Sequence, residues 1–429
     1  MTVFQGFYRE TLNSPFSIMT AMNKGKNSLS FKIRSGEQTS INSDPTFFSD
    51  KNFVIINWRD ILNPKAGGAE RYCYEMARRL ASDGIKVTWI TSGFEGAPSQ
   101  EYHEGIKILR VGNVFTVYLA MIGKFIRNRK NSYILESVNA IPFLSAMLSR
   151  KNKTVMIHHL IPYSVFREKL GFLAPVAYFL QNVLNPVLYR KARVITNSES
   201  TKKELLDQGY MNVNIVKTGV DSGFYKPTIK MDYIVAPGPL RPWKNHSDIL
   251  TAHSILPDNF HLFIFGAAES EGYLQLLKAK AISLGTRERV HFLGKISDDE
   301  KRKLFSISKL SFGASVKEGW GLSNMESQSF GCPVVAYDVP GVRDSVRNYV
   351  TGRLVEFGNI TALASSATEL LTNSSLLNQY SERSISWSRN FQWQECYRDF
   401  LNATVTYSRK LKAEASENRF DLFARLRAR

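Results

Sequence analysis

The stretch KLSFGASVKEGWGLSNMESQSFGCPVVAYDV, residues 309–339, contains the order of elements that decides the fold. KLSFGAS is a short apolar run typical of a buried strand, EGWG is a turn with two glycines, and PVVAYDV is again a strand. Between them LSNMESQSF is expected to form a helix that ends at Gly331. Two strands joined by a helix indicate a parallel pair, because a parallel connection has to cross back over the sheet.

The same order occurs near the start of the chain. NFVIINW (52–58) is a predicted strand, NPKAGG (63–68) a glycine loop, AERYCYEMARRLASDG (69–84) a helix and IKVTWIT (85–91) a second strand. Further strand-like runs form two series, before and after the turn-rich GVDSGFYKPT (219–228). We therefore predict two doubly wound α/β domains, with ligands bound at the carboxyl ends of the strands, in a cleft between the domains.

The domain boundaries follow from these two series. The first α/β domain is expected over 51–225 and the second over 226–392. Residues 1–50 are rich in Ser, Thr, Asn and Lys without a sustained period, so they are expected to be a mobile extension. Residues 393–429 are expected to form a C-terminal helix and a basic tail.

The composition is that of a globular protein with a basic surface. The 429 residues exceed what one core usually organises, and the formal net charge is +18. Such a charge favours anionic partners: phosphorylated small molecules, acidic lipids or nucleic acid. The three cysteines lack a metal-binding spacing, the N-terminus lacks a signal-peptide pattern, and no apolar run reaches the roughly 18 residues of a membrane span. A cytoplasmic location is expected.

Three stretches carry candidate site residues at strand ends. Gly68 precedes a helix whose first amides and dipole attract an anion. His158 and His159 end the strand-like TVMIHH, and alternation places their side chains on opposite faces. In the stretch PGPLRPWKN that begins at Pro237, a glycine and two cations three residues apart suit a diphosphate, and these residues are Gly238, Arg241 and Lys244.

Glu318 and Glu326 indicate which ligand the stretch 309–339 binds. Each carboxylate accepts hydrogen bonds from hydroxyl groups, and the amides of residues 321–323 between them face an anion. A ligand with hydroxyls at both ends and phosphates in the middle fits this layout. A nucleotide-sugar is such a ligand.

These residues also carry a resemblance. EGWGLSNME is similar to the E-x7-E pattern of the retaining GT-B glycosyltransferases of family four, and SQSFGCPVVA follows where that family has a sequence close to EAMAxGxPVVA. The resemblance runs from about Asn52 to Gly352 and includes, in order, NPKAGGAERY, VNAIPF, IHHLIPY, NSESTKKEL, TGVD and PGPLRPWKN. It implies a GT-B fold, with two Rossmann-like domains facing across a cleft, the donor held mainly by the second domain and the acceptor by the first.

The resemblance also implies roles for single residues. Glu326 would bind the ribose, Glu318 the sugar hydroxyls and Lys244 the diphosphate. The remaining cleft and donor-binding positions are Gly68, Gly238, Gly319, Gly321 and Leu322. A histidine would contact the donor sugar or the reaction centre, with His159 favoured over His158. Pro239 stands where the family commonly has an arginine, so either Arg241 replaces it or this cation is absent.

The implied activity is transfer of a sugar from a nucleotide-sugar, with retention, to a glycan or lipid-linked acceptor. No D-x-D sequence is present, and metal-independent chemistry without a cofactor is expected. Two alternatives stay open: a nucleotide-sugar epimerase of the same fold, and a non-catalytic basic scaffold for RNA or acidic lipid. RNA-binding signatures are missing from the sequence, so no nucleic-acid partner is expected.

Two apolar stretches, 114–126 and 170–189, have basic neighbours. One hypothesis is that they dock the protein as a peripheral protein on the inner, anionic face of a membrane. The alternative is that they are buried helices packed on the sheet. The second stretch contains two prolines and three amide side chains, and it is not expected to span a membrane.

Overall fold

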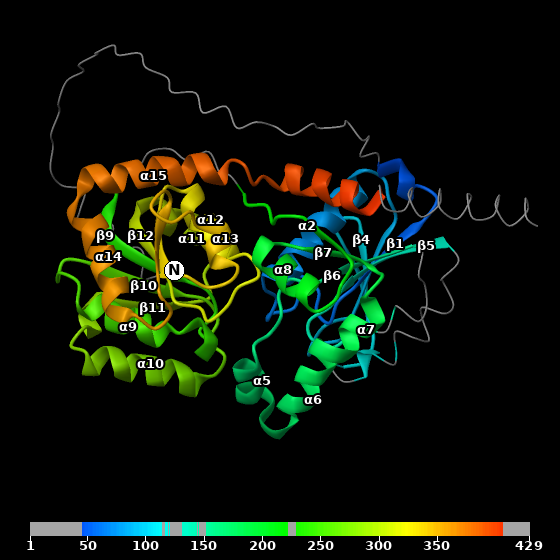
Figure 1. The fold of residues 1–429 in the computed structure, drawn as a ribbon, viewed down its shortest axis with the longest axis horizontal. Helices are drawn as coiled ribbons and strands as arrows, with labels where there is room; N and C mark the ends of the chain where they lie inside the picture. The colour runs from blue at the N-terminus through cyan, green and yellow to red at the C-terminus, as the bar shows by residue number, and fades with distance from the viewer. Residues whose placement is uncertain are drawn as a thin grey trace, which may run out of the picture. The chain divides into compact units, whose positions relative to one another are not determined.

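The computed structural model describes residues 45–113, 116–118, 120, 131–143, 145, 152–221 and 229–405. These residues form two β-sheets, each covered by helices on both faces (Figure 1). Strand β8 (Asn212–Ile215) ends the first sheet and β9 (Met231–Pro237) begins the second along the chain. The predicted fold class, two doubly wound α/β domains, is confirmed.

The first sheet has eight strands in the order β3-β4-β2-β1-β5-β6-β7-β8, and all neighbours are parallel except β3 and β4. The strand order reverses between β1 and β5. The strands other than β8 are β1 (Asn52–Ile56), β2 (Val87–Thr91), β3 (Gln100–His103), β4 (Ile106–Arg110), β5 (Ser132–Ser137), β6 (Lys153–Met156) and β7 (Arg193–Thr196). Two helices of this domain are α2 (Gly68–Ser82), which follows β1, and α8 (Glu199–Asp207), which follows β7.

The central strands of this sheet are apolar on both faces because helices cover both. All six residues of β5 are buried, and Phe53 of β1 is fully buried. On one face, α2 contributes Tyr72, Met76 and Leu80, which pack against Trp89 of β2. This helix follows the predicted glycine loop and holds that loop at the carboxyl end of β1.

The second sheet has six parallel strands in the order β11-β10-β9-β12-β13-β14, which reverses between β9 and β12. Its other strands are β10 (His261–Phe265), β11 (Val290–Gly294), β12 (Ser308–Gly313), β13 (Val334–Tyr337) and β14 (Gly352–Val355). Its helices are α9 (His246–Ser254), α10 (Glu271–Ser283), α11 (Asp298–Ile307), α12 (Leu322–Ser329), α13 (Val342–Ser345), α14 (Ile360–Thr372) and α15 (Ser374–Ser388). The opening strand, turn, helix and strand are therefore β12, the glycine turn, α12 and β13, as predicted.

The expected mobile extension is too long at its C-terminal end. A 3-10 turn, η1 (Pro45–Phe48), precedes β1, and Phe48 is fully buried. Its ring meets the rings of Phe53 and Tyr133 edge-on, at centroid distances of 5.2 and 4.9 Å. Aromatic burial therefore fixes residues 45–50, which the Ser- and Thr-rich composition upstream had concealed. The rest of the predicted extension lies outside the described residues.

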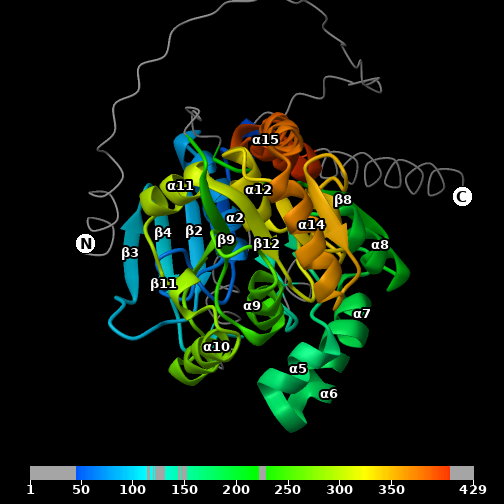
Figure 2. The same cartoon turned by 90° about the vertical axis from the view of Figure 1, so that its left-hand side faces the viewer.

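The C-terminal helix returns to the first domain. A helix over 393–405 follows α15 and lies beside α2 (Figures 1 and 2). Its Trp393, Phe400 and Val405 belong to the same apolar cluster as Phe53 and Tyr72. The helix predicted after Gln392 is thus present, as part of the first core rather than as an appendage, and the basic tail lies outside the described residues.

The apolar stretch 170–189 is helical and mostly exposed. It follows α5 (Tyr163–Leu170) and consists of η3 (Gly171–Leu173), α6 (Ala174–Phe179), the π-helical turn η4 (Leu180–Leu184) and α7 (Asn185–Tyr189). Its side chains include Phe172 at 89% and Val187 at 73% exposure. The alternative that this stretch is a buried helix is wrong. The other stretch, 114–126, lies almost wholly outside the described residues.

Candidate functional site

The candidate site lies where the strand order of the second sheet reverses. β9 and β12 are neighbours there, and the loop after β9 carries Lys244 while the loop after β12 carries Ser315 and Glu318. Lys244 forms an ion pair with Glu318 Oε1, and the hydroxyl of Ser315 donates to the same oxygen over 2.6 Å. Open α/β sheets bind ligands at this position. We call residues 315–326 together with Lys244 the cradle.

The charges of the cradle are balanced internally. Both side chains of the Lys244–Glu318 pair are only 19% exposed. Burial alone raises the pKa of a carboxyl group, but Lys244 and Ser315 outweigh it and hold the pKa of Glu318 below its ordinary value. The pair borders a cavity of about 30 Å³, which has room for water but not for a larger ligand. The cradle is therefore filled by its own ion pair.

Two glycines shape the turn between Glu318 and α12. Gly321 is the N-cap of the helix and has a φ of +80°, a left-handed conformation that favours glycine. A Cβ at Gly319 would lie 2.7 Å from the carbonyl oxygen of His158 and 3.5 Å from Nδ1 of His159. The turn thus passes so close to the backbone of the first domain that a larger residue at 319 does not fit.

The start of α12 presents backbone donors to the same space. Within the described part of the chain, the N–H groups of Leu322 and Ser323 have no hydrogen-bond partner, as is usual in the first turn of a helix. A Cβ at Gly68 would lie 4.0 Å from Leu322 Cδ2, so the start of α2 meets the start of α12. Two helix N-termini with their dipoles at one place suit an anionic group.

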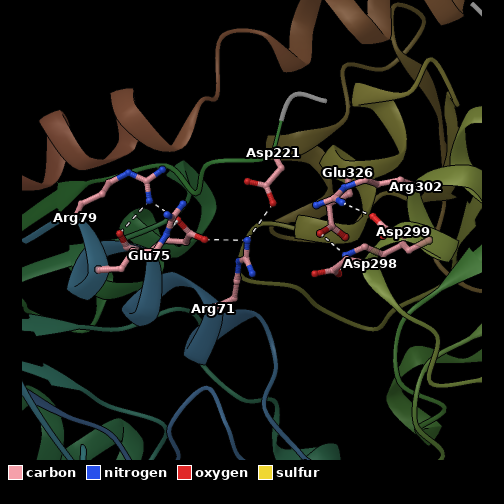
Figure 3. A network of polar contacts seen from close by, with 10 residues as sticks. Arg71, Glu75, Arg79, Asp221, Asp298, Asp299, Arg302 and Glu326 are labelled. Carbon is pink, nitrogen blue, oxygen red and sulfur yellow. Dashed lines mark hydrogen bonds and ion pairs between the residues drawn. The ribbon is translucent and has the colours of Figure 1, made fainter. Parts of the chain in front are cut away.

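Glu326 lies one turn into α12 and has its own lysine. Lys301 Nζ of α11 is 2.8 Å from Glu326 Oε1 and 3.2 Å from Asp298 Oδ1 (Figure 3 shows Glu326 and Asp298 together). Burial by itself lowers the pKa of Lys301, but the two acids outweigh it and raise that pKa. About a quarter of the Glu326 side chain is exposed, at 26%. Both acids of the E-x7-E pattern therefore stand in ion pairs.

The two histidines after β6 point in different directions. Nδ1 of His158 is 2.9 Å from Asn197 Oδ1, and its ring packs edge-on against Tyr72, so it belongs to the first core. His159 lies against Gly319 and within the field of Glu318. Burial is the main cause that lowers the pKa of each histidine to about 4, so both are neutral at neutral pH. Of the two, His159 faces the cradle.

Cations gather on the side of the first domain. The Lys169 ammonium lies 3.9 Å and the Arg241 guanidinium 5.3 Å from the ring centre of Trp243. Arg59, in the loop after β1, stacks on Trp58 at 4.0 Å. Burial lowers the pKa of Arg59 and of Lys169, and the charge of Arg241 lowers both further. Two acids act in the opposite direction, Glu70 on Arg59 and Glu269 on Lys169. Cations that disfavour one another's charge in this way would be stabilised by an anion among them.

Most of the residues expected at the site come together. Those around the cradle are Gly68, His159, Gly238, Lys244, Glu318, Gly319, Gly321 and Leu322. Glu326 lies one turn further along α12, and His158 is turned into the core. Arg241 lies beside Trp243 and near the charges of Arg59 and Lys169. The individual roles of these residues remain predictions.

Sequence reasoning missed the partners of the expected residues. Ser315 and Lys301 bind the two acids, while Arg59 and Lys169 supply the cations of the first domain. Ser315 lies three residues before Glu318 and could have been proposed as a turn partner. Lys301 and Lys169 lie in runs of charged residues on helices. Such runs do not indicate a site residue until the strand order shows which loops lie beside the helix.

Comparisons with known proteins place the chain in a family. Residues 66–224 match the model described as Glycosyltransferase Family 4, and residues 226–387 match the model described as Glycosyl transferases group 1. The chain belongs to this family of GT-B glycosyltransferases, as the sequence resemblance implied.

Named relatives are distant. D-inositol 3-phosphate glycosyltransferase of Salinispora tropica is 26% identical over 240 residues, which are 49% of this chain and 50% of that protein. The chain spans about half the length of the first curated relatives it matches. N-acetyl-alpha-D-glucosaminyl L-malate synthase of Bacillus anthracis is 25% identical over 75% of this chain and 88% of that protein.

A solved structure supports the fold. HepE of Anabaena in complex with UDP-glucose superposes with a TM-score of 0.66 at 17% identity, over 83% of this chain and 99% of that chain. At this identity the likeness concerns the fold alone.

Proposed function

We propose that this protein transfers a sugar from a nucleoside-diphosphate sugar to an acidic glycan or lipid-linked acceptor, with retention at the anomeric carbon. The observation that carries the proposal is the cradle: Glu318 and Lys244 share one oxygen-lined space with the free amides of α12, and the start of α2 and His159 close it from the first domain. HepE of Anabaena, which has the same fold, was solved in complex with UDP-glucose, and this supports a donor of that class.

In the proposed complex, the donor phosphates replace the carboxylate of Glu318 as the partner of Lys244. The small cavity beside the pair favours this exchange, because Lys244 and Glu318 now occupy each other's binding positions. Glu318 is then free to accept hydrogen bonds from sugar hydroxyls, and Glu326 to accept them from the ribose. The amides of Leu322 and Ser323 face the diphosphate and stabilise the negative charge that grows on it as it leaves. One such donor is typically worth about 3–4 kcal/mol of barrier.

The proposed reaction proceeds on one face of the sugar. The bond from the anomeric carbon to the phosphate oxygen breaks and a bond to the acceptor oxygen forms, while the acceptor's proton passes to the leaving phosphate. His159 is neutral beside the sugar and offers a hydrogen bond rather than a second positive charge. We propose that no divalent metal takes part, because Lys244 and the helix start supply the positive charge that such an ion would bring.

The cations of the first domain favour an acidic acceptor. Arg59 and Lys169 lie on the side of the first domain, where the acceptor is expected, and Arg241 lies near both. The names of two relatives include a phosphate and malate, which are acidic groups. A phosphate or carboxylate on the acceptor would be held there while its hydroxyl reaches the donor.

A thermal-shift screen with UDP-, GDP- and ADP-sugars tests donor binding, because a ligand bound to the folded state raises the melting temperature. Transfer to acidic acceptors is then followed with the best donor, with and without EDTA. We expect one nucleotide class to raise the melting temperature of the wild type, and to raise that of Glu326→Gln by less at the same ligand concentration. Activity that vanishes with EDTA and returns with magnesium would contradict the metal-free mechanism, and a shift with RNA instead of any nucleotide-sugar would contradict the transferase.

A further inference from the structure

The segment from α5 to α7 exposes a row of large apolar side chains. Its outward side chains recur at helical spacing and are apolar: Phe172, Val176, Phe179, Val183 and Val187 are exposed at 89, 56, 55, 48 and 73%. In a helix that faces water, these positions would be polar. Large contiguous apolar surfaces of this kind mark a contact with a partner or a lipid phase.

Between Ala174 and Asn185, the inward positions of the same segment are small or polar. Ala174 and Ala177 are buried against Phe166, and Gln181 and Asn185 are only 2% exposed. These positions alternate with the apolar ones at the same helical spacing. The polarity of the segment is therefore reversed, with amides toward the protein and aromatic and aliphatic groups toward the outside.

The buried amides tie the segment to the first domain. Gln181 accepts a hydrogen bond from the N–H of Ile161 over 2.8 Å and donates to the carbonyl of Ile161 over 3.0 Å. Asn185 donates to the carbonyl of Ala140 over 2.8 Å. The segment therefore holds its orientation, with the apolar stripe outward, and α5 and α6 lie apart from the strands in both views (Figures 1 and 2).

Charges are confined to the two ends of the segment. Residues 170–189 contain no Asp, Glu, Lys or Arg. Arg167, Lys169, Arg190 and Lys191 flank the segment, and Glu168 is the single acid among them. An apolar stripe between basic ends complements a surface that is apolar inside and negatively charged at its boundary.

We propose that the stripe of Phe172, Val176, Phe179, Val183 and Val187 docks this protein on an anionic lipid bilayer. The helical segment Tyr163–Tyr189 spans 27 residues, contains an 18-residue window with a mean hydropathy of 1.2, and is long enough to cross a membrane. It lies in the bilayer interface instead, because crossing would break the bonds of Gln181 and Asn185 to the first domain. Since α5 also carries Lys169, which reaches Trp243 beside the cradle, the bilayer would lie next to the acceptor side of the site.

Vesicle flotation of the full chain tests the proposal without any assay of transfer. We expect binding to vesicles of phosphatidylcholine mixed equally with phosphatidylglycerol, and weak binding to phosphatidylcholine alone. The triple variant Phe172→Asp, Val176→Asp, Phe179→Asp should bind at least roughly tenfold more weakly. The control is Leu276→Asp on α10, an exposed apolar residue at 68% away from the segment, which should bind as the wild type does.

A fluorescent label identifies the face that meets the lipid. All three cysteines are buried, so Phe172→Cys introduces a selectively reactive thiol, and Leu276→Cys gives the control. On mixed vesicles the emission of an environment-sensitive dye should shift to the blue at 172 and stay unchanged at 276. A dye at 172 that remains in water on vesicle-bound protein overturns the proposal, because another part of the chain then makes the contact.

Two further results would also overturn it. Equal binding to neutral and anionic vesicles contradicts the role of the basic ends. The other result has three parts: the wild type is a dimer by light scattering, it does not bind vesicles, and the triple variant is a monomer. In that case the stripe joins two copies of the chain. Unchanged circular dichroism and melting temperature in the variants show that the fold is intact.

Discussion

The two halves of the cleft treat charge differently, although each presents a glycine loop and a helix start at a reversal of strand order. In the second domain, each acid of the cradle has a lysine: Glu318 with Lys244, and Glu326 with Lys301. In the first domain, the acid near the loop, Glu70, accepts a hydrogen bond from its own Gly67. Each acid of the second domain thus has a lysine in direct contact before any ligand binds, whereas Arg59 in the first domain lies in the opposing fields of Glu70 and Arg241.

This difference teaches how one site can select two ligands. A balanced cradle attracts no anion in general, and it opens only to a ligand whose phosphates and hydroxyls replace both members of an ion pair. An acidic acceptor would be attracted by Arg59, Lys169 and Arg241, which lower one another's pKa. Donor specificity would then come from exchange of partners, and acceptor capture from net charge.

The largest effect is expected from Glu318→Gln, with Glu326→Gln as its matched partner. The amide at 318 is a weaker acceptor for the sugar hydroxyls and orients the sugar poorly, so kcat/KM should fall roughly 10²- to 10³-fold. At 326 the loss should be roughly tenfold and should appear in the donor KM, because the ribose is remote from the reacting bond. Steady-state kinetics decides, and equal losses in kcat at both positions would contradict the assigned roles.

The next largest effect is expected where the turn at Gly319 contacts the first domain, and its cause is steric. Gly319→Ala places a Cβ 2.7 Å from the His158 carbonyl, so the turn has to move and transfer should fall by roughly 10²-fold. Gly272→Ala on α10 is the control, because no atom lies within 4 Å of the new Cβ, and it should raise stability by about 0.5–1 kcal/mol. Kinetics and melting temperatures of both variants give the answer. Full activity in Gly319→Ala would show that the two domains do not meet here during catalysis.

The histidine pair offers a smaller and more selective comparison. His159→Ala should lower kcat by roughly tenfold with little change in melting temperature, because it removes a hydrogen bond at the cradle. His158→Ala should lower the melting temperature by several degrees, because it empties a core position and leaves Asn197 without its partner. The reverse outcome would mean that His158 is the residue at the reaction centre.

The role of the first-domain cations is tested by Arg59→Gln. We expect the KM of an acidic acceptor to rise about threefold to tenfold, with the donor KM unchanged, because screening and loss of one cation weaken an anion contact modestly. Lys301→Met in the second domain is the counterpart and should change the donor KM alone. If the acceptor KM changes neither in Arg59→Gln nor with added salt, the argument for an acidic acceptor is wrong.

The smallest effect is expected from pH. In the free protein the pKa of His159 is about 4 and that of Glu318 lies below its ordinary value, so neither group changes charge between pH 8 and about 5. Because kcat/KM reports the free protein, it should stay flat there. Stability behaves differently: a histidine with a lowered pKa binds its proton more readily when unfolded. Its contribution is therefore lost as pH falls from about 6.5 toward 4, at about 1.4 kcal/mol per pH unit for each such group. Melting curves across this range measure the loss.

How much could be predicted depended on how local each signal was. The unit β12, glycine turn, α12 and β13 could be predicted because strand, turn and helix each left their own pattern in consecutive residues. The ion pairs could not, because Lys301 meets Glu326 only after the chain has crossed the sheet. The burial of Phe48 could not be predicted either, because its neighbours in the sequence are mostly polar. Its ring packs against Phe53 and Tyr133, which are distant along the chain or lie in another strand.

Composition left two alternatives open in one further place, a buried helix and a membrane-docking one. The apolar segment from α5 to α7 satisfied the pattern of a buried helix, because hydrophobicity alone does not tell which side faces the protein. The buried Gln181 and Asn185 give the direction, and they are recognisable only once their bonds to Ile161 and Ala140 are known.

The return of residues 393–405 to the first core has a consequence for how the protein is made. Trp393, Phe400 and Val405 leave the ribosome after the whole second domain, yet they complete the packing around Phe53. The first half of the chain therefore waits, with part of its apolar surface open, until synthesis is nearly over. A nascent chain stalled anywhere before Trp393 would be a client for chaperones, and the two halves expressed as separate clones cut at the inter-domain linker would not yield a soluble first half.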